Sequence, residues 1–205
     1  YNININSDQT ELFKNFHPDY YVVNGDDSLI KLLNNGYSEK KIVKGEALRY
    51  ENISKKLKSN NLKKIEMPSI LIVGDYSIES NLNIASSLNN LDSQFISKFN
   101  FTLKEHPLRE MSNLLKFQFK KSIESIDAMS DDHHYAIVSN TTSAAVDLYL
   151  LGFKLIVIVD QHNVNLSPLK GNKDIFFLYD QNLLSIYLDK LSKINKKMNN
   201  YVCKF

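Results

Sequence analysis

Short runs of apolar residues alternate along the chain with segments whose apolar positions recur at helical spacing. Residues 69–74 form a continuous apolar run, which is typical of a strand buried on both faces of a sheet. The following segment, 79–91, places Leu82, Ala85 and Leu88 or Leu91 on one stripe and predicts an amphipathic helix. The predicted strands are 20–24, 41–45, 69–74, 98–104, 117–122, 135–140, 155–160 and 175–179. The predicted helices are 28–35, 79–91, 108–115, 125–132, 141–151 and 182–196.

This alternation of strands and helices predicts an α/β fold, a parallel sheet with helices on both faces. Between residues 53 and 66 the composition changes to Lys, Asn and Ser, so we expect a domain boundary at about residue 60. Residues 1–60 would then be the tail of a preceding acceptor-side domain with its connector. Residues 61–205 would form a Rossmann-like domain that binds a donor nucleotide.

Length and composition restrict the class of protein further. The chain has 205 residues, with 25 Lys and Arg against 23 Asp and Glu, and one cysteine. A net charge of +2 gives no strong field of one sign, which disfavours nucleic acid as a partner. One cysteine forms no internal disulfide, and no apolar run approaches the roughly 20 residues that span a bilayer, so a cytoplasmic protein is expected. A start without Met or a signal pattern suggests a piece of a longer protein.

One candidate for chemistry is the segment Lys104-Glu105-His106-Pro107, which follows a predicted strand. Ligands of parallel α/β sheets bind beyond the carboxyl ends of the strands. Because Pro107 fixes the backbone, it presents the imidazole of His106 at the sheet edge, where the ring could donate to a phosphate or ribose oxygen. From these residues alone, a surface histidine before a helix is an equally good interpretation.

A second candidate is the hydroxyl cluster Thr141, Thr142 and Ser143, at a junction between a predicted strand and a predicted helix. Hydroxyl groups beside the free N–H groups of a helix N-terminus suit a phosphate. Ordinary capping needs one of them, so the surplus favours a ligand. Gly74 ends another strand and lets the backbone approach a ligand, although an ordinary turn is the simpler interpretation of residues 74–77.

Motifs of several other functions are absent from the sequence. It contains no G-x-G-x-x-G fingerprint, no P-loop, no G-x-S-x-G and no zinc-ligand spacing. The adjacent pair His133-His134 fits a solvated loop better than a metal site. We therefore expect neither a metal nor another cofactor.

Taken together, the K-x-H-P segment at 104–107 and the Ser/Thr cluster at 141–143 resemble the nucleotide-binding half of GT-B glycosyltransferases. The likeness is closest to bacterial enzymes of surface-polysaccharide synthesis that use cytidine-activated donors, the sialyl-, Kdo- and glycerol-phosphate transferases. The segment 18–48 looks like the region just before the donor domain of such enzymes. The resemblance implies that His106, Pro107 and the hydroxyl groups hold the donor phosphate and ribose. It also implies that Asp147 matches an acidic position that some relatives use toward the donor.

The resemblance implies the donor-binding C-terminal region of a glycosyltransferase. Its partners would be a nucleotide-sugar donor, CMP- or CDP-linked, and a glycan or lipid-linked acceptor. The family's catalytic base lies in the N-terminal half, so no catalytic residue is assigned, and we expect the chain alone to bind nucleotide with little or no transfer. The basic residues of the last predicted helix suit either peripheral membrane contact or a solvated face. Two alternatives stay open, a non-catalytic Rossmann-like binding or regulatory module and a sugar-nucleotide epimerase of GT-B architecture.

Overall fold

The computed structural model describes residues 18–45, 67–160 and 164–197. The chain divides into two compact units, residues 1–52 and residues 53–205. The boundary expected at about residue 60 falls within 46–66, outside the described residues.

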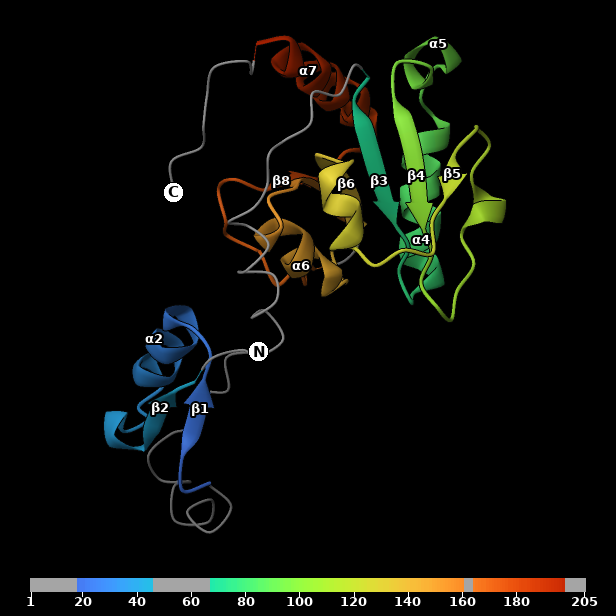
Figure 1. Cartoon of the computed structure of the whole chain (residues 1–205). Coiled ribbons are helices and arrows are strands. Elements are labelled where there is room, and N and C mark those ends of the chain that lie inside the picture. The colour runs from blue at the N-terminus through green and yellow to red at the C-terminus, as the bar shows by residue number, and fades with distance from the viewer. Residues whose placement is uncertain (1–17, 46–66, 161–163, 198–205) are drawn as a thin grey trace. The chain divides into compact units, whose positions relative to one another are not determined.

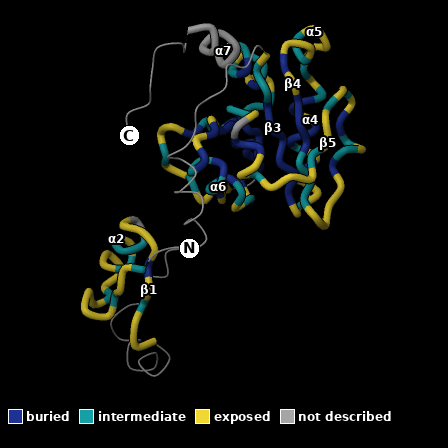
Figure 2. The backbone as a smooth tube through the Cα atoms, viewed as in Figure 1, coloured by how far each residue is buried: buried dark blue, intermediate teal, exposed yellow. Residues whose placement is uncertain are grey.

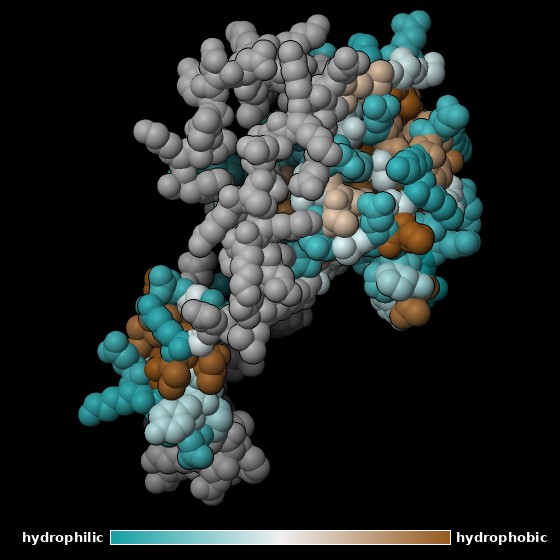
Figure 3. Space-filling model, in the orientation of Figure 1, coloured by the Kyte–Doolittle hydropathy of each residue, from teal (hydrophilic) through white to brown (hydrophobic). Residues whose placement is uncertain are grey.

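The smaller unit contains one strand–helix–strand repeat. Its elements are β1 (Tyr21–Val23), α2 (Asp26–Asn34), η3 (Glu39–Lys41) and β2 (Ile42–Lys44). The two strands pair in parallel, with Val22 opposite Val43, and these side chains are 72% and 44% exposed. Hydrophobic side chains therefore show on the surface of this unit (Figure 3). Both predicted strands and the predicted helix are present, but only Val23 of β1 is buried.

The larger unit is built on one sheet. Its elements are β3 (Ser69–Val73), α4 (Ile78–Asn89), α5 (Ser93–Ile96), β4 (Asn100–Lys104), η5 (Ser112–Leu114), β5 (Lys120–Lys121), η6 (Ala128–Asp131), β6 (Tyr135–Ser139), α6 (Ala144–Leu150), β7 (Lys154–Ile158), β8 (Phe176–Leu178), η7 (Gln181–Leu183) and α7 (Leu184–Lys197). The six strands lie in the order β5-β4-β3-β6-β7-β8, and every pair is parallel (Figure 1). The order reverses between β3 and β6, as in a Rossmann-like sheet. The predicted α/β fold is confirmed.

Alternate residues of the central strands point to opposite faces of the sheet, as strand geometry requires. Ile70 and Ile72 of β3 belong to a core that also holds apolar side chains of α4 and α7. Leu71 and Val73 belong to a second core that holds side chains of α6. Figure 2 shows the resulting layer of buried residues along the central strands. Helices therefore cover both faces of the sheet, and the continuous apolar run at 69–74 reflects burial on both.

Two predicted helices differ from the structure. Residues 108–115 contain only the short turn η5, because residues 106–109 form a turn in which the N–H of Arg109 donates to the carbonyl of His106 at 3.0 Å. Residues 125–132 likewise contain only the 3-10 turn η6.

The buried stripe of α4 also differs from the prediction. Leu82 is 48% exposed, whereas Asn81, Ile84, Ala85 and Leu88 are buried. The prediction is therefore confirmed for Ala85 and Leu88 and wrong for Leu82, because the polar Asn81 occupies the first buried position.

Candidate functional site

Gly74 brings the end of β3 against the segment that follows β4. Its N–H donates to the carbonyl of Lys104 at 2.9 Å. A Cβ atom at Gly74 would lie 3.1 Å from the backbone nitrogen of His106, closer than ordinary van der Waals contact. A glycine at this position therefore allows the ends of β3 and β4 to approach each other, and it places the backbone of His106 next to Gly74.

Asp75, the next residue, joins the end of β3 to the end of β6. Its side chain is buried and accepts hydrogen bonds from the hydroxyl groups of Ser139 and Thr141, the latter at 2.7 Å. The N–H of Ser77 donates to the other carboxylate oxygen at 3.0 Å. Burial alone would raise the pKa of Asp75, but these hydrogen bonds outweigh it and hold the pKa below its usual range. Asp75 is therefore a charged anchor at the point where the strand order reverses.

The hydroxyl protons around this anchor point inward. Because Thr141 gives its proton to Asp75, the 3.2 Å contact between the hydroxyls of Ser80 and Thr141 has Ser80 as its donor. Thr141 is exposed, and its hydroxyl thus offers an incoming group its remaining lone pair rather than a proton. Next to a carboxylate, this arrangement favours ligand groups that donate hydrogen bonds, such as sugar hydroxyls.

Asn81 locks the loop that carries Asp75. Its side chain accepts from the N–H of Asp75 at 2.7 Å and donates to the carbonyl of the same residue at 2.9 Å. Both amide atoms are thereby used inside the protein, which explains why a fully buried asparagine occupies the apolar stripe of α4.

His106 begins the turn after β4, and one of its ring nitrogens is used within that turn. The N–H of Leu108 donates to its Nδ1 at 3.2 Å. An Nδ1 that accepts carries no proton, so the proton of the neutral ring is on Nε2 and can be donated. Pro107 fixes this turn, as the sequence predicts, but the turn continues into an extended segment rather than a helix.

Glu105 supports the same turn from inside. One carboxylate oxygen accepts from the N–H groups of Met111 and Ser112 at 2.9 and 2.8 Å, and the other pairs with Lys121 at 2.9 Å. Burial alone would raise the pKa of Glu105, but the hydrogen bonds from Lys121 and from the two backbone groups lower it to about 2.

A cavity of about 530 Å³ opens beside this turn, and its lining includes Lys104, His106, Pro107 and Arg109. Three residues predicted for the site, all from the segment 104–107, thus line this cavity. Gly74 and residues 141–143 are not part of its lining. The Nζ of Lys104 donates to the carbonyl of Glu124 at 2.6 Å, so this amine is already engaged by the protein.

The remaining predicted residues lie at α6. Ser143 is the N-cap residue of α6, but the hydroxyl that accepts from the N–H of Ala144, at 3.3 Å, belongs to Thr142, which keeps its own proton for donation. Ser143 is exposed and makes no side-chain capping bond. Asp147 is a partly buried residue of α6.

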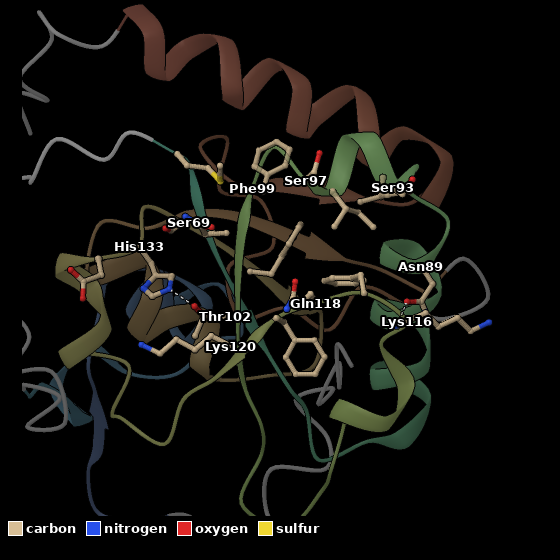
Figure 4. A pocket seen from close by; sticks show the side chains of 18 residues that line it. Ser69, Asn89, Ser93, Ser97, Phe99, Thr102, Lys116, Gln118, Lys120 and His133 are labelled. Carbon is tan, nitrogen blue, oxygen red and sulfur yellow. Dashed lines mark hydrogen bonds between the residues drawn. The ribbon is translucent and has the colours of Figure 1, made fainter.

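A larger cavity of about 1040 Å³ lies at the opposite end of the sheet, where β3 and β4 begin (Figure 4). Phe99, Ser97 and Ser93 line one side, and a hydrogen bond of 2.8 Å joins His133 to Thr102 on another. His133 also contacts the carbonyl of Met129 at 3.1 Å, and burial lowers its pKa. The pair at 133–134 is therefore half-buried and not, as expected from the sequence, part of a solvated loop.

Sequence reasoning missed the residues that organise the carboxyl-end site. The sequence predicts an ordinary turn at Asp75, and no motif marks Asn81 or Glu105. The one available signal was the asparagine at the first position of the apolar stripe of α4, since a buried amide needs partners.

The chain combines a Rossmann-like α/β unit with a polar site at the carboxyl ends of β3, β4 and β6. Searches for a matching protein family and for a matching curated protein find none. Among the described residues, no three His, Cys, Asp or Glu side chains are grouped to hold a metal ion. No helix within the described ranges is long and apolar enough to cross a membrane.

Proposed function

We propose that the larger unit binds the nucleotide of an activated sugar and forms the donor-binding part of a glycosyltransferase. The observation that carries this proposal is the double contact of residues 74–75. A Cβ at Gly74 would lie 3.1 Å from the backbone nitrogen of His106, which follows β4. Asp75 holds the hydroxyl of Thr141, which follows β6, where the strand order reverses. Ligands of open α/β sheets bind at this position.

The chemistry of the two sides supports a nucleotide in particular. Around Asp75 the surface offers lone pairs and negative charge, which suits the hydroxyl groups of a ribose or sugar. Around His106 the surface offers an Nε2–H donor, which suits a phosphate. The cavity there is lined by three basic residues, Lys104, Arg109 and Lys121, and by two acidic residues, Glu105 and Glu110. A nucleotide presents both kinds of group a few ångströms apart.

In this proposal the phosphate is the leaving group of sugar transfer, and fixed donors at the sheet edge stabilise its developing charge. Cytidine as the base, and a glycan or lipid-linked acceptor, rest on the resemblance of residues 104–107 and 141–143 to cytidine-dependent transferases. A cytoplasmic protein, with or without contact to the membrane surface, fits this role.

A non-catalytic binding module is the second candidate, because apolar side chains stand beside the smaller cavity. Leu108 is 73% exposed and Ile123 is fully exposed. A module that binds an apolar ligand or partner at this edge would need no nucleotide.

A thermal-shift screen with cytidine, uridine and guanosine nucleotides separates these functions. A rise in melting temperature with cytidine nucleotides alone supports the proposed transferase, and a uridine response points to another sugar-nucleotide enzyme. No response to any nucleotide would reject the proposal and favour the module.

Two variants then test the role of His106 by calorimetry. His106→Ala should weaken CMP binding by about 1 to 3 kcal/mol, the usual effect of losing a hydrogen bond to a charged group. His106→Asn can still accept from the N–H of Leu108 but lacks the Nε2 donor, so it should lose a similar amount. Unchanged affinity in both variants would reject the assignment of His106.

A further inference from the structure

We infer that Arg109, which no sequence motif marked, is the residue that binds the phosphate at this site, and that Tyr76 orients it. The inference rests on the proposed function and names the part of the site that takes the anion. It follows from the geometry of the turn at 106–109 and from the loop that faces it.

The turn places His106 and Arg109 side by side. Pro107 occupies its second position, which a fixed φ favours, and the N–H of Arg109 donates to the carbonyl of His106 at 3.0 Å. The two residues also form an isolated antiparallel bridge. Residues paired in this way project their side chains to the same side.

Tyr76, directly after Asp75, contacts both side chains. Its ring meets the ring of His106 edge-on, with the centroids 5.7 Å apart. The guanidinium carbon of Arg109 lies 5.3 Å from the centroid of the Tyr76 ring, a cation–π distance. The tyrosine is nevertheless 58% exposed, so these contacts form at the open edge of the site.

Arg109 is the cation of this cavity that is left to bind a ligand. Lys104 donates to the carbonyl of Glu124, and Lys121 pairs with Glu105. Arg109 makes no ion pair or side-chain hydrogen bond with another residue in the described ranges.

The positive charge of Arg109 also acts on the carboxylate of Glu79. The pKa of Glu79 is lowered, first by the hydrogen bond from the Ser77 hydroxyl, at 2.8 Å, and further by Arg109. The acid therefore already has a hydrogen-bond partner in its own loop.

The chemistry of Arg109 fits a phosphate. A guanidinium presents N–H groups as a planar fork that matches two phosphate oxygens at once. The Tyr76 ring takes the place of water next to the cation and restricts its motion, while the N–H groups stay available at its rim. The Nε2–H of His106 supplies a further donor on the same side of the turn. By contrast, the charged Asp75 beneath Thr141 disfavours an anion there.

Calorimetry with CMP and with cytidine tests the inference, because the two probes differ only in the phosphate. Arg109→Gln should weaken CMP binding about tenfold or more and change cytidine binding less than twofold, since only the phosphate contact is lost. Lys98→Gln is the matched control: Lys98 also lies over an aromatic ring, 5.2 Å from the centroid of Phe95, but just before β4 begins. It should leave binding of both probes unchanged.

Tyr76 has its own matched pair of variants. Tyr76→Phe keeps the ring and should bind CMP like the wild type, whereas Tyr76→Ala should weaken CMP selectively, by less than Arg109→Gln. Thermal denaturation of each variant checks that it is folded.

Two failures lead to different conclusions. If the wild type binds neither CMP nor cytidine, the proposed function is rejected, and this inference with it. If the wild type binds CMP and Arg109→Gln has no effect, or lowers CMP and cytidine affinity equally, only the role of Arg109 is rejected.

Discussion

The two ends of the same sheet each carry a cavity, and both cavities are lined by polar as well as apolar side chains. At the carboxyl end the cavity is about 530 Å³, and its lining includes Glu105 and the ion-pair partner Lys121. A separate hydrogen-bonded cluster around Asp75 lies at the end of the adjacent strand. At the amino end the cavity is about 1040 Å³ and is bordered by phenylalanine rings that contact one another, such as Phe101 and Phe117 with centroids 4.9 Å apart. The larger cavity is therefore not the one beside the hydrogen-bonded residues that follow the strands.

This difference shows why volume alone does not locate a site. In a parallel sheet, the loops after the strands all emerge at the carboxyl end, so polar side chains from distant segments meet there. Residues 75 and 141 are far apart in sequence yet share a hydrogen bond of 2.7 Å. At the amino end the rings of Phe101 and Phe117 pack against each other and mainly stabilise the fold.

Removing the carboxylate of Asp75 should have the largest effect on stability. In Asp75→Ala the hydroxyls of Ser139 and Thr141 and the N–H of Ser77 lose their acceptor, and the free energy of unfolding should fall by about 2 to 4 kcal/mol. Urea denaturation at pH 7 measures this change. Ser143→Ala is the control, since this exposed hydroxyl makes no capping bond and its loss should change stability by less than about 0.5 kcal/mol. Equal stability of the two variants would show that the hydrogen bonds of Asp75 do not stabilise the carboxyl ends of β3 and β6.

Glu105 should make the carboxyl end sensitive to acid. Its pKa is lowered to about 2 in the folded protein, so its contribution is complete above the ordinary carboxyl pKa and is lost as the pH falls toward 2. Glu105→Gln should therefore be less stable than the wild type by about 2 kcal/mol at pH 7, after allowance for partial solvent screening. The gap should narrow as the pH falls from about 5 to 2.

Urea denaturation at a series of pH values measures the difference in unfolding free energy between the wild type and Glu105→Gln. The titration of Asp75 does not affect this difference, because both proteins contain Asp75. A gap that stays constant over the whole pH range would contradict the ion pair with Lys121.

Most of the sheet could be predicted from sequence because buried strands leave a strong pattern. The runs at 69–74, 135–140 and 155–160 are buried on both faces of the sheet, and each overlaps a strand of it. The prediction of a helix at 108–115 is wrong. Met111 and Leu115 are buried although their segment is mostly not helical, because Glu105 holds the backbone of that segment at Met111. Such an anchor depends on a tertiary contact that local spacing does not encode.

The site could be predicted only in part for a related reason. The residues at 104–107 and 141–143 stood out because they follow strands. The roles of Asp75 and Asn81 depend on hydrogen bonds that form only when α4 packs on the sheet. In the sequence these two residues look like part of a turn and part of a helix. The error at Leu82 has the same origin, since the buried position on that turn of α4 is taken by the polar Asn81, which an apolar pattern does not count.

The smallest effect is expected at the amino end, where the hydroxyl of Thr102 lies 2.8 Å from Nε2 of His133. Thr102→Val keeps the shape and removes that hydrogen bond, so the free energy of unfolding should fall by about 1 kcal/mol. Nucleotide affinity should stay within twofold of the wild type, because the phosphate and ribose are proposed to bind at the other end of the sheet. Calorimetry with CMP checks this directly. If Thr102→Val weakened CMP as much as His106→Ala does, the larger cavity would be the nucleotide site, and the contrast between the two ends would be reversed.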